Sequence, residues 1–281
     1  MDNPAIYLRN LLISLLKCII RRYPFYNKPL DVLDSTVRQL AIDLGNKQPD
    51  NTVKSTNTII VFSGGGWMSC FMFGVARYME THYKGRLDNL CFAGVSAGAL
   101  AATGLALGCD SKGLFEDTLK CYPHFPTRKD IREGAESINV GDDAWRRVSN
   151  RLYLGVTRIP GIVKENLSTF SNQQDGIMAI EASCQFPLFV GMVPLKIANK
   201  YYYDGAILHE YPYIPKGMED YRKIYVNSKG PGDICPGIDI PFLWILCPPS
   251  VEVMWQLEHL GYLRAKEYFS SAHSRDGTEA A

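Results

Sequence analysis

The sequence lacks the charge excess and the long apolar runs that mark several large classes of protein. Its 281 residues include 30 Lys and Arg and 29 Asp and Glu, a formal net charge of +1. There is therefore no global field to attract nucleic acid, and no nucleic-acid partner is expected. No apolar run reaches the roughly 20 residues that a membrane-spanning helix needs, so no transmembrane segment is expected either.

Close cysteine pairs are also missing. The eight cysteines are scattered, and none forms the C-x-x-C pair of a zinc or redox site. We interpret them as reduced thiols of a cytoplasmic protein. His82, His124 and His273 have no metal-ligand spacing, so no metal or cofactor is expected. A secretory signal is not expected, because Arg9 and Lys17 interrupt the first apolar stretch.

Two helical patterns precede a polar stretch. In Ala5–Arg22 the apolar residues share one helical face and the basic residues share the other. Such a helix suits a membrane or lipid-droplet surface, and packing on the domain is the alternative. A second helix is predicted over Leu30–Leu44, followed by a linker over Asn46–Asn57. The predicted division is an N-terminal segment at 1–57, a catalytic domain at 58–269 and a disordered tail at 270–281.

From Thr58 onward, strand-like apolar runs alternate with helical stretches. The alternation predicts an α/β fold, a three-layer sandwich with a mainly parallel central sheet. The charged stretch Thr127–Arg151 is an insertion that either caps a site or forms a solvated surface excursion. The predicted strands are Thr58–Phe62, Leu90–Val95, Leu152–Thr157, Val193–Tyr203, Lys223–Asn227 and Phe242–Leu246, and the helices are Met68–Tyr83, 97–107, Gln173–Ser183 and Val251–Phe269.

Residues 94–98, Gly-Val-Ser-Ala-Gly, match the pattern G-x-S-x-G. This pattern is typical of a tight strand-to-helix turn that lifts a serine hydroxyl out of the sheet. Here it follows an apolar strand and begins an alanine-rich helix, the context that the turn requires. Ser96 is therefore predicted to be a nucleophile, and the helix N-terminus at Ala97 is predicted to help stabilise an oxyanion.

Three glycines, Gly64, Gly65 and Gly66, end the first strand of the predicted domain. Consecutive N–H groups without side chains can point into one concavity, as an oxyanion hole needs. A phosphate-binding loop would require Gly-Lys-Ser or Gly-Lys-Thr nearby, whereas residues 67–70 are Trp-Met-Ser-Cys. The glycines and the Ala97 N–H are therefore expected to face a carbonyl oxygen.

The predicted serine nucleophile needs a base within hydrogen-bond reach. Asp204 ends a predicted strand and precedes Gly205, a place where parallel sheets gather functional groups. Asp-Gly alone is more often a turn, but the serine turn and the glycine loop favour a catalytic carboxylate. Asp204 is therefore the predicted base.

These motifs, in this order, resemble the patatin-like phospholipase family. They are Ser-Gly-Gly-Gly at 63–66, Gly-Val-Ser-Ala-Gly at 94–98 and Asp-Gly-Ala at 204–206. The run Ala-Ser-Cys-Gln-Phe-Pro-Leu-Phe at 182–189 is similar to that family's helix that ends before a proline. The resemblance covers approximately Thr58 to Phe269, and the glycine loop is most similar to the adipose triglyceride lipase and adiponutrin branch.

The resemblance implies a Ser–Asp dyad that hydrolyses acyl esters of phospholipids or acylglycerols through an acyl-serine. Ser96 would attack the carbonyl, Asp204 would take the proton, and the three glycines would donate to the oxyanion. Many family members carry a basic residue shortly after the glycines, whereas this chain has Trp67 and Met68. Because the reference pKa of aspartate is only about 4, an apolar cleft must raise the pKa of Asp204.

Two alternatives stay open. A Ser-His-Asp triad would use His209 or His259, which follow Asp204 in the chain. Against it, the serine turn lies on only the second strand of the predicted domain, and His209 has a turn-like, surface context. A catalytically dead lipid-binding protein is the second alternative, which the intact Ser96 and Asp204 disfavour. The sequence does not indicate an oligomeric state, a head group or a chain-length preference.

Overall fold

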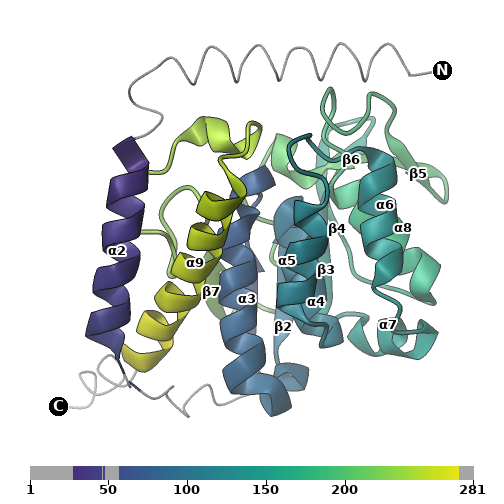
Figure 1. Ribbon diagram of the computed structural model, residues 1–281. Coiled ribbons are helices and arrows are strands. Elements are labelled where there is room, and N and C mark those ends of the chain that lie inside the picture. The colour runs from purple at the N-terminus through teal and green to yellow at the C-terminus, as the bar shows by residue number, and fades with distance from the viewer. Residues whose placement is uncertain (1–27, 46, 48–56, 272–281) are drawn as a thin grey trace.

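The computed structural model describes residues 28–45, 47 and 57–271, and its centre is a seven-stranded sheet (Figure 1). The strand order is β5-β6-β3-β2-β1-β7, with β4 paired to β3. Strands β3, β2, β1 and β7 run parallel. β4 and β6 pair antiparallel with β3, and β5 pairs antiparallel with β6. The strands are β1 (Thr58–Phe62), β2 (Cys91–Val95), β3 (Leu152–Ile159), β4 (Val163–Leu167), β5 (Leu195–Ile197), β6 (Lys200–Asp204) and β7 (Arg222–Val226).

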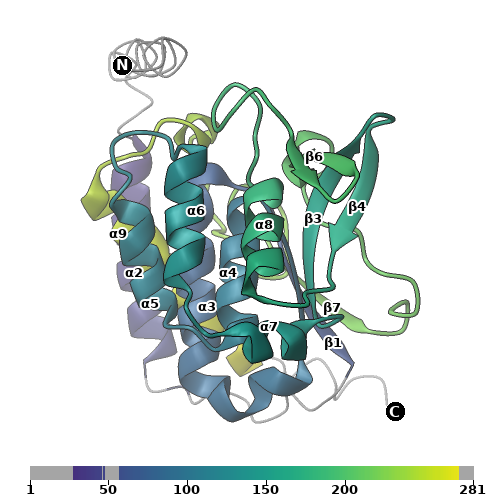
Figure 2. The same cartoon turned by 90° about the vertical axis from the view of Figure 1, so that its right-hand side faces the viewer.

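A layer of helices covers one face of the sheet, and Figure 2 shows them gathered on one side of the strands. α4 packs directly on β1, β2 and β3, and α8 packs on β3 and β6. The helices are α2 (Lys28–Leu44), α3 (Cys70–Tyr83), α4 (Ala97–Leu107), α5 (Ser111–Leu119), α6 (Arg128–Ser137), α7 (Asp142–Val148), α8 (Gln173–Ser183) and α9 (Val251–Ser271). Short 3₁₀ turns are η2 (Gly66–Ser69), η3 (Lys84–Asn89), η4 (Gly205–Ile207) and η5 (Phe242–Ile245).

Strand β1 shows why the sheet forms where it does. All five of its residues are buried, because Ile60 and Phe62 face the helical layer while Ile59 and Val61 face the opposite side. A strand buried on both faces reads as a continuous apolar run rather than an alternating one. The opposite face is covered by the segment after η4, which contributes Met218, Tyr211 and Tyr221.

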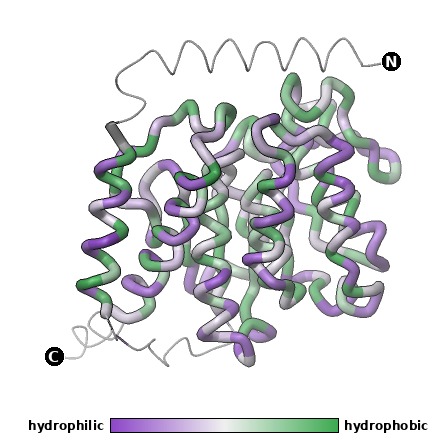
Figure 3. Tube along the Cα trace, in the orientation of Figure 1, coloured by the Kyte–Doolittle hydropathy of each residue, from purple (hydrophilic) through white to green (hydrophobic). Residues whose placement is uncertain are grey.

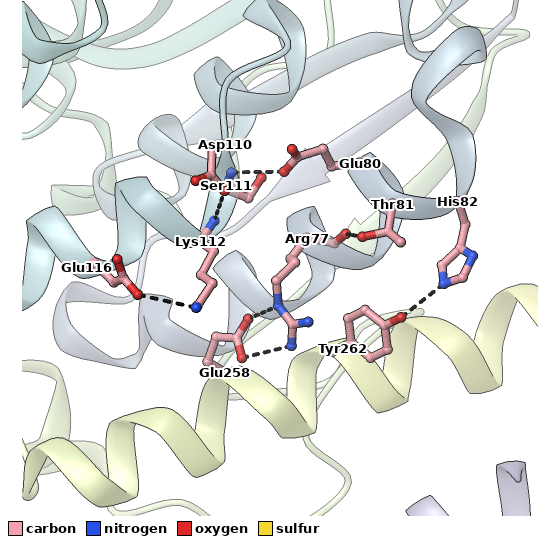
Figure 4. Close-up of polar contacts among 10 residues, drawn as sticks. All are labelled: Arg77, Glu80, Thr81, His82, Asp110, Ser111, Lys112, Glu116, Glu258 and Tyr262. Carbon is pink, nitrogen blue, oxygen red and sulfur yellow. Dashed lines mark hydrogen bonds and ion pairs between the residues drawn. The ribbon is translucent and has the colours of Figure 1, made fainter.

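The junction of α3 and α9 is the tightest helix contact in the layer. A Cβ on Gly74 would lie 1.7 Å from the Glu258 carbonyl oxygen, and one on Gly261 would lie 1.9 Å from that of Phe71. Glycine therefore lets the two backbones touch. Across this contact Arg77 donates to both carboxylate oxygens of Glu258, at 2.5 and 3.0 Å (Figure 4). The junction thus contains a buried carboxylate that a guanidinium neutralises.

The predicted fold class, a layered α/β fold around a mainly parallel sheet, is confirmed. The helix predicted at Leu30–Leu44 is α2, which packs against α9. The domain division at residue 57 stays a prediction. The helix predicted at Ala5–Arg22, most of the linker predicted at Asn46–Asn57 and most of the tail predicted at 270–281 lie outside the described residues. Residues 270 and 271 of that predicted tail belong to α9 instead.

Two strand predictions need correction, and the structure adds elements that had no predicted counterpart. Phe242–Leu246 is the 3₁₀ turn η5 and not a strand, because prolines at 241, 248 and 249 flank it. The strand predicted at Val193–Tyr203 is the hairpin β5–β6, which turns at Ala198 with φ +51°. The insertion Thr127–Arg151 folds into α6 and α7, and α5 and β4 had no predicted counterpart. No helix within residues 28–45 and 57–271 is long and apolar enough to span a membrane.

Candidate active site

Ser96 occupies the sharp turn between β2 and α4. Its backbone has φ +55° and ψ −131°, a conformation that is strained for a residue with a side chain. The turn is closely packed, since a Cβ on Gly94 would lie 2.3 Å from the Gly98 carbonyl oxygen. A Cβ on Gly98 would lie 2.2 Å from that of Ser63. These contacts explain why the G-x-S-x-G motif has glycine at both ends.

The register of β3 brings Ser96 and Asp204 together. Val95, the last residue of β2, pairs with Gly155, and Asp204, the last residue of β6, pairs with Val156. Strand β4 pairs with residues 154–158 of β3 and so occupies its other edge. The ends of β2 and β6 therefore meet on one edge of β3, although 108 positions separate the two side chains in sequence.

The two side chains are in direct contact. Ser96 Oγ donates to Asp204 Oδ2 at 2.6 Å, and the Ala206 N–H donates to Asp204 Oδ1 at 2.7 Å. Asp204 is fully buried. Gly205 is required next to it, because a Cβ there would lie 2.5 Å from Val95 Cγ2 and 2.6 Å from the Gly155 carbonyl oxygen. The glycine after Asp204 thus allows this turn to pack closely against β2 and β3.

Burial gives Asp204 the proton affinity of a base. Desolvation raises its pKa from the ordinary value of 3.8 to about 7, and this outweighs the opposing effects of the Ser96 and Ala206 hydrogen bonds. The charge of Lys229 opposes the rise as well. A carboxylate with this pKa matches the working pH of a general base far better than an exposed aspartate does.

The predicted oxyanion donors are only partly free to act. The Gly64 N–H donates to the Glu210 carbonyl oxygen at 3.0 Å, so this N–H group already has a protein acceptor. Gly65, Gly66 and Ala97 line the cleft beside Ser96. Within residues 57–271 the N–H groups of these three residues have no protein acceptor, so they are the candidate donors.

Two buried positioning residues escaped the sequence prediction. Ser183 Oγ accepts from the Ser96 N–H at 3.0 Å and donates to the Gly155 carbonyl oxygen at 2.8 Å, which holds the serine turn against β3. Asn227 accepts from Ser63 Oγ at 3.4 Å and donates to Glu210 Oε1 at 2.9 Å. Ser183 lies in the run singled out at 182–189, and Asn227 directly follows a parallel strand, which was a usable signal.

The dyad opens into an apolar cleft of about 290 Å³. Within the described part of the chain, Lys229 is the one charged side chain along this cleft. An apolar wall suits an acyl chain better than a polar substrate. The remaining lining consists of Gly64, Gly65, Gly66, Trp67, Ser69, Ser96, Ala97, Leu100, Thr118, Phe125, Pro126, Ile131, Cys184, Phe186, Val190, Ala206, Phe242, Ile245 and Leu246.

The charged insertion contributes one wall of the cleft through Ile131 on α6. Arg132 anchors that helix by donating to both carboxylate oxygens of the buried Glu181 on α8, at 2.9 and 3.0 Å. Arg128 lies 3.8 Å from the same carboxylate. Of the two interpretations of Thr127–Arg151, the structure therefore supports the one in which the insertion caps a site.

Neither histidine of the alternative triad contacts the dyad. His209 is exposed, and His259 lies on the exposed side of α9, where its ring stacks with Tyr262 at 6.4 Å between centroids. A triad requires an imidazole between serine and aspartate, whereas here the two side chains bond directly at 2.6 Å. The geometry therefore favours the dyad.

Comparison with known proteins shows which family part of the chain resembles. Residues 60–154 match the family model described as "Patatin-like phospholipase", a range that contains the glycine loop and Ser96 but not Asp204. Patatin-like phospholipase domain-containing protein 2 of Rattus norvegicus is 29% identical over 197 residues, which cover 65% of this chain and 40% of that protein.

A second relative is 1-acylglycerol-3-phosphate O-acyltransferase Pnpla3 of Mus musculus. It is 26% identical over 240 residues, which cover 73% of this chain and 57% of that protein. The chain therefore spans about half the length of these relatives. Among solved structures, VipD from Legionella pneumophila matches with a TM-score of 0.40 and 16% identity, over 61% of this chain and 50% of that one.

Proposed function

We propose that this chain is a lipid acyl hydrolase that cleaves carboxylic esters of phospholipids or acylglycerols, which its similarity to patatin-like phospholipases supports. The observation that carries this proposal is the 2.6 Å contact between Ser96 Oγ and the buried Asp204 carboxylate. The apolar cleft around the dyad supports a lipid substrate.

In the acylation step, Asp204 Oδ2 takes the proton of the Ser96 hydroxyl as Oγ bonds to the ester carbonyl carbon. The negative charge on the carbonyl oxygen is stabilised by N–H groups of Gly65, Gly66 and Ala97. When the tetrahedral intermediate collapses, Asp204 returns the proton to the leaving alcohol, and an acyl-serine remains.

Deacylation repeats the same proton transfers with a different nucleophile. Asp204 takes a proton from a water molecule, whose oxygen attacks the acyl carbon, and the fatty acid leaves as Ser96 regains its proton. A lipid alcohol in place of water would give acyl transfer, the activity that the name of the mouse relative states for that protein. Product analysis separates these two outcomes.

The site of action is part of the same proposal. We infer a cytoplasmic protein that associates peripherally with a membrane or lipid-droplet surface through the amphipathic pattern of Ala5–Arg22. That pattern is the support for this part, since the segment lies outside the described residues. Deleting residues 1–27 should weaken vesicle binding and spare hydrolysis of a short soluble ester, and unchanged binding would exclude the idea.

The experiment that tests the activity is lipid profiling with purified protein. Wild type and Ser96→Ala are incubated with phosphatidylcholine vesicles and with a triacylglycerol emulsion, and both fatty acid release and transacylated products are measured. Ser111→Ala is the matched control, because Ser111 is also buried, its hydroxyl has no hydrogen-bond partner in the described structure, and it does not line the cleft.

We expect fatty acid release by wild type and by Ser111→Ala and at least a thousandfold less by Ser96→Ala. Equal release by all three proteins would contradict the proposal. Absence of release by folded wild type on both substrates would favour the lipid-binding alternative instead.

A further inference from the structure

Large apolar side chains are exposed on two loops, although surface loops are usually polar. Leu188 is 68% exposed and Val193 is 70% exposed on the loop between α8 and β5. Phe242 is 71% exposed on η5, with Leu243 exposed beside it. Single exposed apolar residues are common, but a group of them on neighbouring loops usually marks an interaction site.

These loops surround one opening. The α8–β5 loop lines the cleft with Phe186 and Val190, and η5 lines it with Phe242 and Ile245. A third segment, η4 and the residues after it, lines it with Ala206. The α8–β5 loop follows α8, η4 follows β6, and η5 precedes α9. Figure 3 shows hydrophobic stretches along the upper edge of the molecule, where α9 begins in the orientation of Figure 1. The exposed apolar residues are therefore continuous with the apolar cleft.

The α8–β5 loop is held in its exposed shape. The buried amide of Gln185 donates to the Gly191 and Val193 carbonyl oxygens, at 3.2 and 2.9 Å. The Tyr203 hydroxyl donates to the Met192 carbonyl oxygen at 2.5 Å. Leu188 has φ +70°, a left-handed conformation that is costly for leucine. A residue that is both strained and exposed gains nothing for the isolated fold, which points to a partner.

The composition of the loops indicates the chemistry of that partner. Residues 186–193, 205–208 and 241–247 contain no Asp, Glu, Lys or Arg. Lys229 lines the cleft, but the three segments themselves offer no charge that would select a charged peptide or a nucleic acid. They match an uncharged apolar medium into which the side chains can insert, and an ester-bearing lipid that enters the cleft comes from such a medium.

We propose that the cleft mouth carries an apolar rim that inserts into the surface of a lipid bilayer or monolayer, defined by Leu188, Met192, Val193, Leu208, Phe242 and Leu243. This inference rests on the proposed function and names the surface through which the same site meets its substrate. The cleft then opens directly into the lipid, and an acyl chain enters it without crossing water. Because insertion is apolar, binding through the rim depends little on salt, unlike binding through a basic helix.

The test uses the full chain with three substitutions that keep the loop backbone intact. Leu188→Asn is chosen because asparagine tolerates a positive φ, and Met192→Gln and Leu243→Gln remove exposed apolar surface without adding charge. None of the three residues lines the cleft. The control is Val32→Gln with Ile42→Gln, which removes two exposed apolar side chains from α2.

Co-sedimentation with phosphatidylcholine vesicles is measured at low and high salt, beside hydrolysis of a short soluble ester and the melting temperature. We expect the vesicle affinity of the triple variant to be lower than that of wild type by roughly tenfold or more at both salt concentrations. The control should bind vesicles like wild type, and all proteins should melt together and hydrolyse the short ester at equal rates.

Vesicle binding by the triple variant equal to that of wild type would overturn the rim, as would an equal loss in the α2 control. A rim that instead docks a protein would give the first of these results. Failure of the proposed function looks different: wild type would then fail to hydrolyse the short ester, whatever its vesicle binding.

Discussion

Asp204 and Glu258 are both buried carboxylates, yet they lie in opposite electrostatic surroundings. At the α3–α9 junction, Arg77 donates to both oxygens of Glu258, so the ionised carboxylate has a full counter-charge in contact. Among the described residues, the hydrogen-bond partners of the Asp204 carboxylate in the cleft are a hydroxyl and an amide N–H. Burial therefore raises the pKa of Asp204 to about 7. The same chain thus contains one buried carboxylate paired with a cation and one whose raised pKa suits the proton transfer that we propose.

Glu181 repeats the structural arrangement, since Arg132 donates to both of its oxygens. Glu181 and Glu258 show that burial of an acid does not by itself indicate a catalytic role. A buried acid is a candidate base when no cation neutralises it and its hydrogen-bond donor is a nucleophile that can give up a proton.

The largest expected effect is the loss of turnover in Asp204→Asn. An amide cannot accept the serine proton, so hydrolysis of a short soluble ester should fall about a thousandfold, within the range known for a lost general base. Thermal denaturation at pH 8 should show no loss of stability, because the substitution removes a buried charge that has no counter-ion. Retained turnover would show that Asp204 is not the base.

Breaking the Arg77–Glu258 ion pair should lower stability and leave activity unchanged, the opposite of the Asp204→Asn result. Glu258→Gln leaves Arg77 without its charge partner, and unfolding free energy should fall by about 3 kcal/mol while the turnover number of the folded enzyme is unchanged. Chemical denaturation measures the unfolding free energy. Active-site titration gives the concentration of folded enzyme, to which the turnover number is normalised. The double variant Glu258→Leu with Arg77→Met should recover much of the stability that Glu258→Gln loses. Failure to recover it would show that the α3–α9 junction depends on packing rather than on the ion pair.

The pKa of Asp204 predicts two pH dependences of opposite sense. Because the base must be ionised, activity should fall as the pH drops below about 7. Folding binds a proton when a carboxyl pKa is raised, so the contribution of Asp204 to stability is complete below 3.8 and is lost as the pH rises through about 7. Wild type should therefore lose stability relative to Asp204→Asn across this window, and parallel curves would contradict the raised pKa.

Lys229 gives a finer test of the same electrostatics. Its positive charge lowers the pKa of Asp204, so Lys229→Met should move the acid limb of the activity profile to higher pH. Lys229→Arg, which keeps the charge, should leave the limb in place. The pH–rate profile for a short ester measures both variants, and an unmoved limb in Lys229→Met would contradict the coupling.

The smallest expected effect belongs to the histidines. His209→Ala and His259→Ala should leave turnover within about twofold of wild type, because neither imidazole lies between Ser96 and Asp204. Steady-state kinetics on the short ester checks this expectation. A large loss in either variant would restore the triad.

The sequence predicted the parts of the site that depend on local pattern. Ser96 was identifiable because its turn needs small residues at fixed spacing, and those contacts recur in the structure at Gly94 and Gly98. Asp204 required an inference about which strand ends meet. The partners of the Gly64 N–H and the roles of Ser183 and Asn227 depend on loops that pack from distant parts of the chain, and local pattern does not contain that information.

The fold shows the same division. Strand β1 and helix α8 were predicted with their observed bounds, because a continuous apolar run and a clear helical pattern dominate there. Residues 242–245 are apolar for another reason, since they line and surround the cleft, and an apolar run of that length resembles a buried strand. An apolar run that lines a surface cleft can therefore be mistaken for a buried strand when only the hydrophobic pattern is considered.

The central claim is that Asp204 alone activates Ser96, and the rate at which a fluorophosphonate probe labels Ser96 tests it most directly. Labelling is followed from pH 5 to pH 9 in wild type, in Asp204→Asn and in the two histidine variants. We predict that labelling rises with an apparent pKa near 7 in wild type and in both histidine variants, and that it is nearly absent in Asp204→Asn at every pH. Labelling of Asp204→Asn at the wild-type rate, or its loss in a histidine variant, would contradict the account.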